Sequence, residues 1–277
     1  MRKIGFIYLK GGFGNQLFQF TFAKYLEDLG LKIYVDTSNF SKSILSRDPN
    51  IELRELVLEP KYFDFNKLNK FSSSMLMNFI EIPKNPLLLK LYDTNLELNN
   101  LKKYNFFDGY WQDPKMVLQY KDFLNHSISK NNLISLERNA ARKSGDTIVH
   151  VRRRDYLNLN EDLKLSFFKE AIDTASKKIE KFSYSVFTDD YEWVSKQSIF
   201  LGADKIYSSS NSIDNTLSDF GKMLSFNHFI VGNSTFSLMA ALLNTNRDKF
   251  IIIADPWFRN VNKDIDIPNV IKIKNTL

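Results

Sequence analysis

The chain of 277 residues contains no cysteine, which excludes disulfide bonds, zinc sites with thiolate ligands and cysteine nucleophiles. Histidine is scarce: His126, His150 and His228 are the only ones, so a histidine-rich metal site is not expected. No stretch approaches the roughly 18 apolar residues that span a bilayer. The apolar run 4–9 is too short for a secretory signal, and glycines follow it. We therefore expect a cytoplasmic protein.

The remaining composition is that of a soluble globular protein. Hydrophobic residues make up 43% and charged residues 25% of the chain, and its length suffices for one large domain or two ordinary ones. The net charge of +6 favours anionic partners such as phosphorylated substrates, nucleic acid or membrane surfaces. Scattered lysines carry most of that charge. The consecutive arginines Arg152, Arg153 and Arg154 are therefore the more informative feature.

Short apolar runs alternate with segments of helical periodicity in both halves of the chain. In the first half the pattern predicts a strand at 4–9, a helix at 17–26 and a strand at 31–35, while 40–105 reads as mixed helical and irregular. In the second half it predicts strands at 146–151, 184–187, 205–207, 229–231 and 250–254, and helices at 165–179, 191–199, 217–225 and 236–243. Such alternation predicts an α/β fold with parallel sheets.

A short polar link at 140–145 divides the two halves. We expect an N-terminal domain of residues 1–143 and a C-terminal domain of residues 144–277. Each would be a Rossmann-like unit, because right-handed crossovers make consecutive strands parallel. The tail after residue 256 is expected to pack back across the first domain.

A glycine turn between the first strand and the first helix is the first candidate site. Backbone N–H groups at a helix start favour an anion, and glycines such as Gly12 and Gly14 let a ligand approach the main chain. The amides of Asn15 and Gln16 follow directly and suit hydrogen bonding to a ligand. A plain tight turn is the simpler interpretation.

The same turn only partly fits a dinucleotide-binding motif. That motif requires a third glycine, and Leu17 stands at its position. Asp36 lies about where a ribose-binding acid would lie, which keeps the dinucleotide interpretation open.

The segment 150–155 is the second candidate. It follows a predicted strand, and alternation places His150 and Arg152 on one side and Arg153 on the other. Arginine binds phosphate through its planar fork, and open α/β sheets bind ligands at the carboxyl ends of their strands. This favours a diphosphate site. A solvated basic loop, or an arginine paired with Asp155, is the alternative.

Two further loops follow predicted strands. Asp189 and Asp190 end one strand: one of them is expected to cap the next helix, and the other could accept two N–H bonds from a guanine edge. The other loop carries Asn233, Ser234, Thr235 and Phe236, where a hydroxyl-bearing helix start can cap itself or cradle a phosphate.

Two other acidic positions are less informative. Asp219, on the preceding predicted helix, fits a surface charge or a ligand contact equally well. Asp264 and Asp266 have the spacing of a nucleotide-sugar metal motif, but they lie outside the repeating strand–helix region, and we interpret them as surface residues.

Together these segments resemble, in order, the motifs of glycosyltransferase family 11, the α-1,2-fucosyltransferases. Residues 11–20 are similar to its N-terminal signature, with Phe13 where leucine is commoner. Residues 150–155 match its HxRRxD motif, which α-1,6- and protein O-fucosyltransferases share. The later motifs are matched by 188–190, 219–220 and 228–237, and a further family segment by 109–112.

The resemblance implies a GT-B fold, with two Rossmann-like domains whose parallel sheets face each other across a nucleotide-sugar cleft. It implies transfer of L-fucose from GDP-β-L-fucose, with inversion, to the 2-hydroxyl of a terminal β-galactoside in surface-glycan or O-antigen synthesis. It implies neither a metal nor another cofactor. The donor would bind the C-terminal domain. The acceptor, in one version a lipid-linked oligosaccharide, would bind the N-terminal domain.

Residue roles also follow from the resemblance. Arg152 would bind the β-phosphate, His150 the guanosine, and Asp189 or Asp190 the guanine. Asp155 is the candidate general base, and Asn15 would reach the sugar–phosphate region. The expected donor set also includes Gly12, Gly14, Arg153, Asp219, Asn233, Ser234, Thr235 and Phe236, and the expected acceptor set is Gln16, Tyr110 and Trp111.

Several alternatives stay open. The HxRRxD motif alone allows another fucosyl linkage, such as α-1,6 or α-1,3. From other classes, an NAD-dependent oxidoreductase and a non-catalytic carbohydrate-binding protein remain. A nucleic-acid partner is not expected, because aromatic and basic residues are not interleaved. The positive charge suggests peripheral contact with the cytoplasmic face of the inner membrane.

Overall fold

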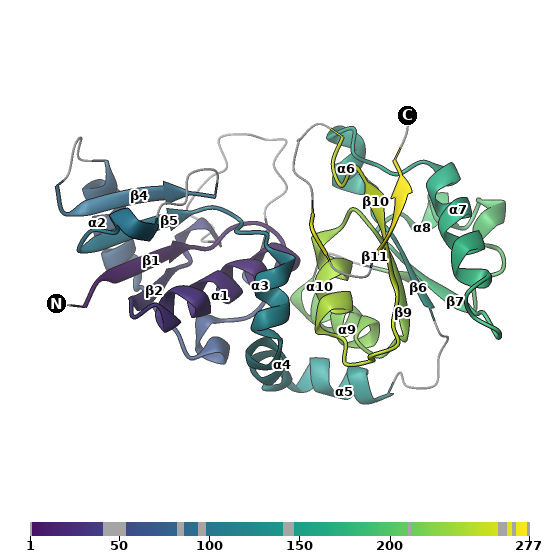
Figure 1. Ribbon diagram of the computed structural model, residues 1–277, viewed down its shortest axis with the longest axis horizontal. Coiled ribbons are helices and arrows are strands. Elements are labelled where there is room, and N and C mark those ends of the chain that lie inside the picture. The colour runs from purple at the N-terminus through teal and green to yellow at the C-terminus, as the bar shows by residue number, and fades with distance from the viewer. Residues whose placement is uncertain are drawn as a thin grey trace. The chain divides into compact units, whose positions relative to one another are not determined.

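The computed structural model describes residues 2–40, 54–81, 86–93, 98–140, 147–209, 212–259, 265–267 and 270–275. The chain divides into two compact units, Met1–Lys130 and Asn131–Leu277, each built on one parallel sheet (Figure 1). The two parallel α/β sheets expected from the sequence are thus confirmed. The expected boundary at 143/144 lies outside the described residues, and the helix before it belongs to the second unit.

The first unit contains a five-stranded parallel sheet in the order β3-β2-β1-β5-β4. Its strands are β1 (Ile4–Tyr8), β2 (Lys32–Asp36), β3 (Asn66–Lys67), β4 (Leu88–Tyr92) and β5 (Tyr104–Asp108). Its helices are α1 (Phe13–Asp28), α2 (Lys70–Ile80), α3 (Pro114–Gln119) and α4 (Lys121–Ser129), with short 3₁₀ turns at Ser38–Phe40, Pro60–Phe63 and Leu98–Asn100. The β-α-β start predicted from the sequence is confirmed, because β1 and β2 pair in parallel.

Stacked aromatic rings hold the first unit together. On α1, Phe20 lies 3.9 Å from Phe63 and Phe22 lies 4.2 Å from Trp111, measured between ring centroids. All four rings are at most 6% exposed. Burial of side chains this large contributes roughly 1.5–3 kcal/mol each. The core therefore fixes α1, and with it the glycine turn at its start, against the sheet.

The second unit contains a six-stranded parallel sheet in the order β11-β10-β9-β6-β7-β8. Its strands are β6 (Thr147–Val151), β7 (Tyr184–Thr188), β8 (Lys205–Ser208), β9 (His228–Gly232), β10 (Ile251–Asp255) and β11 (Val270–Lys274). Its helices are α5 (Asn132–Ala140), α6 (Arg154–Asn158), α7 (Leu165–Ser176), α8 (Tyr191–Val194), α9 (Ile213–Met223) and α10 (Thr235–Leu243), with a 3₁₀ turn at Ser198–Phe200.

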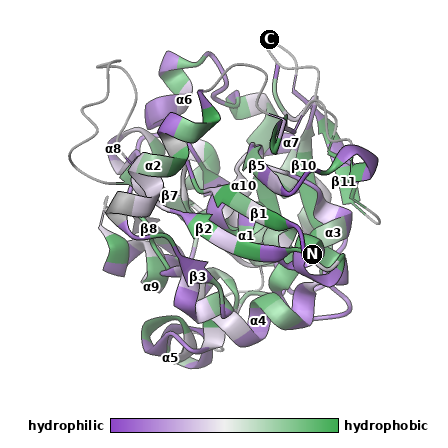
Figure 2. Cartoon of the chain, turned by 90° about the vertical axis from the view of Figure 1, so that its left-hand side faces the viewer, coloured by the Kyte–Doolittle hydropathy of each residue, from purple (hydrophilic) through white to green (hydrophobic). Residues whose placement is uncertain are grey.

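The central strands of this sheet are buried on both faces. Every residue of β6 and β7 is buried, as expected for parallel strands covered by helices. In α10, every residue from Ser237 to Leu243 is buried. Most residues of α10 are hydrophobic, whereas α5 carries hydrophobic and hydrophilic residues (Figure 2).

The described part of the tail corrects one prediction. We expected the chain after residue 256 to pack across the first domain. Instead β11 pairs in parallel with β10, from Ile251 opposite Val270 to Asp255 opposite Lys274. An exposed strand edge leaves backbone N–H and C=O groups without partners, and this pairing satisfies them on one side of β10. These residues therefore complete the second sheet.

Candidate functional site

The loops after β6, β7 and β9 meet at one edge of the second sheet. β6 pairs with β7 on one side and with β9 on the other, so their carboxyl ends are adjacent. Open α/β sheets bind ligands at this edge. The sequence had placed the arginine segment, the two aspartates and the Asn233–Phe236 loop after these strands, and the structure brings the three segments together.

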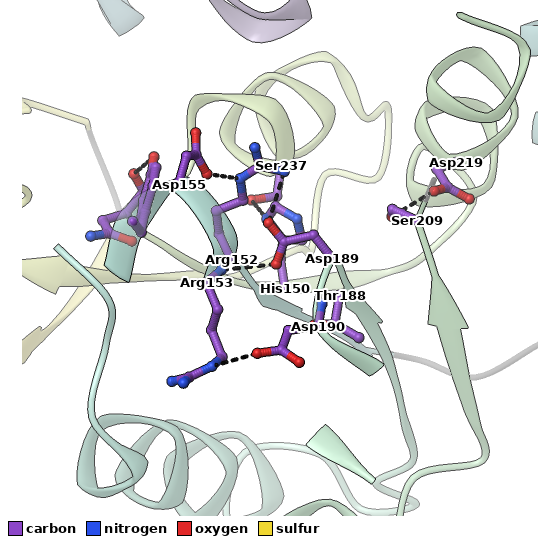
Figure 3. Close-up of polar contacts among 12 residues, drawn as sticks. His150, Arg152, Arg153, Asp155, Thr188, Asp189, Asp190, Ser209, Asp219 and Ser237 are labelled. Carbon is purple, nitrogen blue, oxygen red and sulfur yellow. Dashed lines mark hydrogen bonds and ion pairs between the residues drawn. The ribbon is translucent and has the colours of Figure 1, made fainter. Parts of the chain in front are cut away.

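Arg152 lies between two carboxylates. Its Nε donates to Oδ1 of Asp155 at 2.8 Å, and its Nη1 lies 3.0 Å from Oδ2 of Asp189 (Figure 3). Burial would lower the pKa of the guanidinium, but Asp189 and Asp155 outweigh it and raise that pKa. The side chain keeps 20% of its surface exposed. Arg152 is therefore a fixed cation with a face left for solvent or ligand.

Asp189 contacts both Arg152 and Arg153 and fixes the loop that carries them. Its side chain is 3% exposed, and Oδ1 accepts the backbone N–H of Arg153 at 2.9 Å. Oδ2 has no hydrogen-bond partner among the described residues, so its 3.0 Å contact with Arg152 is an ion pair without hydrogen-bond geometry. Burial raises the pKa of this carboxyl, while Arg152 and the backbone N–H lower it. The carboxylate expected to contact guanine is thus engaged within the protein.

Asp190 is the helix cap that one of the two aspartates was expected to be. Oδ1 accepts the N–H of Trp193 at 3.2 Å, at the start of α8. Oδ2 accepts from Nε of Arg153 at 3.1 Å. Both oxygens have partners in the protein.

Arg153 is largely buried, and its side chain contacts three other residues of the second unit. Its guanidinium carbon lies 3.7 Å from the centroid of the Trp193 ring, and its Nη1 lies 3.5 Å from Oδ2 of Asp162. With Asp190 as a third partner, the side chain is only 11% exposed. In Figure 3 it runs away from Arg152, as the alternation of residues had predicted. Arg152, and not Arg153, is the exposed cation of the pair.

His150 is buried and uncharged. Its Nδ1 lies 2.9 Å from Oγ of Ser237, and the ring is 6.0 Å from that of Phe236. Burial first, and the charge of Arg152 second, lower its pKa to about 3. A neutral ring cannot donate a proton as an acid near neutral pH. His150 can position α10, or contact a ligand as a neutral group.

The start of α10 completes this edge. Ser234 occupies the N-cap position, but its hydroxyl makes no capping hydrogen bond, and the first turn has no acidic side chain. Thr235 and Phe236 are half-buried. The first N–H groups of a helix lack intrahelical acceptors and carry partial positive charge. This helix start therefore suits an anion.

The side chain of Asn233 is used to fix the loop before α10. Its Nδ2 donates to the backbone oxygen of Glu161 at 2.8 Å, and its own backbone oxygen accepts from the Tyr156 hydroxyl at 3.1 Å. Gly232 has φ +67°, and a Cβ there would lie 2.7 Å from Leu163. Only glycine suits this turn.

Asp219 lies apart from the arginines, on α9 (Figure 3). Oδ2 accepts from Oγ of Ser209 at 2.7 Å, and Oδ1 is 4.0 Å from Nζ of Lys222. The residue is 7% exposed, and burial raises the pKa of its carboxyl. Its 4.0 Å ion pair with Lys222 is longer than the ion pairs of Asp189 and Asp190 with their arginines, at 3.0 and 3.1 Å.

In the first unit, the glycine turn starts α1 as predicted. Gly11 has φ +78°, Gly12 is the N-cap with open space at its Cβ position, and Gly14 is buried inside the helix. Oδ1 of Asn15 accepts from Nε2 of Gln112 at 2.8 Å.

Two residues of the expected acceptor set belong to the core. Gln16 is fully buried: its Nε2 donates to the backbone oxygens of Gly11 and Glu55, and its Oε1 accepts the N–H of Val57. Trp111 is 6% exposed and stacks on Phe22, and its indole N–H has no partner. Neither presents a polar group to solvent.

Tyr110 is the exposed member of that set. Its residue is 36% exposed, and its backbone N–H is held by Oδ2 of Asp93 at 3.0 Å. Nζ of Lys10 lies 5.0 Å from the ring centroid and 2.7 Å from Oδ1 of Asp108. A Cβ on Gly11 would lie 2.8 Å from the Tyr110 ring, so the ring lies across the glycine turn.

Asp36 does not fit the dinucleotide interpretation. It is fully buried, and Oδ1 accepts from the Ser38 N–H at 2.9 Å and the Ser73 hydroxyl at 2.8 Å. Oδ2 is buried without a partner. The carboxylate stabilises the chain after β2 and has no surface for a ribose.

Among the described residues, no group of three or more His, Asp or Glu side chains could hold a metal ion. Asp264 lies outside the described residues, and Ile265 beside it is buried. Within the same described ranges, no helix is both long and apolar enough to cross a membrane.

Sequence reasoning missed several residues around this site. Asp162 and Trp193 hold Arg153, and Glu161 and Arg259 form a buried pair beside them. In the first unit, Lys10 and Asp108 flank Tyr110. None of them lies in a recognisable motif. Lys10 and Asp108 do adjoin motif residues, which is the one signal that could have pointed to them.

Comparisons with known proteins identify the family of this chain. Residues 3–265 match the family described as Glycosyl transferase family 11. The O-antigen biosynthesis glycosyltransferase WbnK of Escherichia coli is 25% identical, over 92% of this chain and 95% of its own.

Two solved structures are similar at lower identity. The NodZ alpha-1,6-fucosyltransferase soaked with GDP-fucose, a protein known from Bradyrhizobium, is 16% identical with a TM-score of 0.49 over 88% of this chain and 93% of its own. A mutant of Arabidopsis thaliana FUT1 in complex with GDP is 14% identical with a TM-score of 0.46 over 91% and 70%. Since the family match itself runs through both units and every loop described above, the chain belongs to glycosyltransferase family 11.

Proposed function

We propose that this glycosyltransferase moves L-fucose from GDP-β-L-fucose to the 2-hydroxyl of a terminal β-galactoside, in surface-glycan or O-antigen synthesis. Membership of family 11 and the similarity to an O-antigen glycosyltransferase support the pathway. The observation that carries the donor assignment is Arg152, a partly exposed cation held by two carboxylates beside the start of α10.

In the proposed reaction, the acceptor hydroxyl oxygen forms a bond to the anomeric carbon of fucose as the bond to the β-phosphate oxygen breaks. The electron pair of the broken bond stays on GDP, whose negative charge grows. Preorganised positive groups stabilise such charge more effectively than mobile water does. Arg152 and the N–H groups of the first turn of α10 supply them, and the proposal includes no metal or other cofactor.

The acceptor proton must also leave. Asp155 is our candidate base, but its Oδ1 already accepts from Nε of Arg152. A carboxylate in this position orients the arginine whether or not it takes the proton. The variant Asp155→Asn separates the two roles. If Asp155 is the base, the variant should lose a step in its pH–rate profile. If Asp155 only positions Arg152, the variant should bind GDP more weakly.

We assign guanine contact to Asp219 in preference to Asp189 and Asp190. Both oxygens of each of the latter contact an arginine or a backbone N–H. Among the described residues, the Asp219 carboxylate contacts a hydroxyl at 2.7 Å and an ammonium group at 4.0 Å, but no arginine or backbone N–H. A carboxylate matches the paired N–H donors of a guanine edge. The ring of His150 is neutral, so it can contact the nucleoside and does not repel the neighbouring cation Arg152.

For the acceptor we assign the Tyr110 cluster, defined as Lys10, Asn15, Asp108, Tyr110 and Gln112. Tyr110 offers an exposed ring, against which the apolar face of a hexose can pack, and the polar side chains around it offer donors and acceptors to hydroxyls. Lys10 and Asp108 neutralise each other. This balance favours an uncharged sugar over a diphosphate.

The test has two stages. First, thermal shifts with GDP, UDP, CMP and NAD should show stabilisation by GDP alone, because a ligand that binds only the folded state raises the melting temperature. Stabilisation by NAD instead would favour the oxidoreductase. Second, incubation with GDP-fucose and lactose should give a product whose linkage NMR identifies. An α-1,6 or α-1,3 product would correct the linkage, and GDP binding without transfer would favour a binding protein.

The location is a separate proposal. We infer a cytoplasmic protein that contacts the inner membrane peripherally, where a lipid-linked acceptor would lie; the net charge of +6 supports it. Cell fractions prepared at low and high salt test this, because screening should release a protein held by charge. Recovery in the soluble fraction at every salt concentration would contradict it.

A further inference from the structure

We propose that Arg259, which lies outside every motif discussed above, is a positioning residue for the donor site. The inference concerns the second unit alone, and it deepens the proposed function because the site it supports is the anion site of that function. Arg259 follows β10, in the segment of chain that the sequence had suggested would leave this unit.

Arg259 clamps the loop between α6 and α7. Its backbone N–H donates to Oε2 of Glu161 at 2.8 Å, and its Nη2 donates to the backbone oxygen of Asp162 at 2.7 Å. Its Nε lies 3.9 Å from the Glu161 carboxylate and its Nη2 lies 3.8 Å from Oδ1 of Asp162. The side chain is 11% exposed. Arginines this buried are held by partners, and here the partners are two consecutive acidic residues.

One branch of contacts runs from this clamp to the arginine loop. Asp162 lies between two arginines: Oδ1 faces Arg259, and Oδ2 lies 3.5 Å from Nη1 of Arg153. Arg153 in turn stacks on Trp193, and its backbone N–H donates to Asp189, the ion-pair partner of Arg152. The chain of contacts therefore ends on the cation that we assign to the diphosphate.

A second branch runs to the start of α10. The backbone oxygen of Glu161 accepts from Nδ2 of Asn233, the residue before the N-cap Ser234. The same stretch is packed from the other side, where the Tyr156 hydroxyl donates to Asn233 and the Tyr156 ring meets Phe258 edge-on at 6.2 Å. Arg259 thus supports both positive elements of the site, the guanidinium and the helix start.

Loss of the Arg259 charge has a definite electrostatic consequence. Glu161 is 5% exposed and Asp162 is largely buried, so both carboxylates would lose a nearby cation in a poorly solvated place. A buried charge without its partner either takes up a proton or moves toward water. Movement of the 161–162 loop would shift Arg153 and Asn233 together.

The first measurement needs no substrate. The chain has three tryptophans, so 5-fluorotryptophan gives three fluorine signals, which Trp→Phe variants assign. In Arg259→Met we expect the signal of Trp193 to move, because its ring packs on Arg153 and not on Arg259. The signal of Trp257 will move as a neighbour, and that of Trp111 should stay. An unmoved Trp193 signal would overturn the proposal.

The second measurement is steady-state transfer with GDP-fucose and lactose at a temperature where every variant is folded. Displacement of positioned groups by about 1 Å costs up to about 100-fold, so we expect Arg259→Met to lower kcat/KM for the donor by about 10- to 100-fold, and Arg259→Lys to restore part of it. With Asp162→Asn, the two losses should combine less than additively. Full additivity would overturn the proposed path.

A matched control separates positioning from stability. Arg2, in the first unit, donates to the backbone oxygens of Gly30 and Leu31 at 2.9 and 3.1 Å, so Arg2→Met also removes an arginine that holds backbone carbonyls. We expect a lower melting temperature with kcat/KM within about twofold of wild type. If Arg259→Met resembles Arg2→Met in kcat/KM, Arg259 only stabilises the fold. If wild type transfers no fucose, the proposed function fails, and the fluorine signals still test the positioning.

Discussion

The two units end their parallel sheets in chemically different ways. At the carboxyl edge of the second sheet, Arg152 and Arg153 are held by aspartates next to an open helix start. At the carboxyl edge of the first sheet, Tyr110 and Asn15 flank a neutral Lys10–Asp108 pair. Similar sheets thus present a fixed positive site in one unit and a balanced, partly aromatic one in the other. This difference supports our proposal that the diphosphate binds the second unit and the uncharged sugar the first.

The largest expected effect comes from removal of the exposed cation. In Arg152→Ala, developing charge on GDP loses its main stabilising group, and we expect kcat to fall by about 100- to 1,000-fold. The protein should remain folded, because Asp155 and Asp189 can take up a proton or contact water. The measurement is transfer rate together with the circular dichroism of the folded state. Arg154→Ala, at an exposed position on α6, is the control and should be nearly as active as wild type. Wild-type turnover in Arg152→Ala would remove Arg152 from the mechanism.

A smaller loss is expected when the arginine is kept and its support is changed. In Asp189→Asn, the amide can still accept the N–H of Arg153 but no longer pairs electrostatically with Arg152. We expect donor kcat/KM to fall by about 10- to 100-fold, in line with charge-assisted contacts of roughly 1.5–3 kcal/mol. Steady-state kinetics at varied GDP-fucose measures this. An effect as large as that of Arg152→Ala would instead indicate that Asp189 itself touches the donor.

A substitution in the first unit should change the KM for the acceptor and leave the KM for the donor unchanged. Tyr110→Ala removes the exposed ring, and we expect the KM for lactose to rise about fivefold while the KM for GDP-fucose stays unchanged, since ring contacts contribute about 1 kcal/mol. Tyr92→Ala removes another exposed tyrosine, on the neighbouring strand β4, and serves as the matched control. A rise in donor KM in Tyr110→Ala would place the nucleotide at this edge and break the comparison.

A further effect concerns the pH dependence of stability. The folded pKa of His150 is about 3 against 6.5 in the unfolded chain, so protons bind the unfolded state first. Its stabilising contribution is therefore complete above pH 6.5 and is lost as pH falls from 6.5 toward 3, by about 1.4 kcal/mol per unit. Between pH 6.5 and 5, wild type should lose more unfolding free energy than His150→Gln. Equal losses in urea titrations would show that the ring titrates normally.

The same burial has a kinetic counterpart. Because His150 stays neutral through the physiological range, the pH profile of kcat/KM should lack a step near 6.5 that belongs to it. A step that appears in wild type and disappears in His150→Gln would assign acid–base work to this ring.

The sequence could predict what lies in contiguous motifs at strand ends. His150 lies near the end of β6 and Arg152 follows the strand directly, Asp190 caps the next helix, and Ser234 is the N-cap of α10. In parallel sheets the carboxyl ends of the strands carry the site. Two strands, β3 and β4, stayed hidden in the stretch 40–105. β3 has two residues, too few for a periodic signal, and the five residues of β4 do not alternate between buried and exposed.

Contacts between residues that are distant in the sequence could not be predicted from it. Gln16 looks like a ligand-binding amide until Glu55 and Val57 are found on it. Arg259 and Asp162 are 97 residues apart, and no spacing rule joins them. Such pairs are set by how loops fold over one another, which composition and periodicity do not encode.

The central claim is that Arg152 neutralises the diphosphate of the donor while other groups bind its nucleoside. Calorimetric titration of wild type and Arg152→Ala with GDP and with guanosine, in a buffer containing a chelator, tests it most directly. We predict that Arg152→Ala weakens GDP binding by about 100-fold, the factor that corresponds to roughly 2.7 kcal/mol, and leaves guanosine binding unchanged. Equal affinities of the two proteins for GDP would contradict the claim.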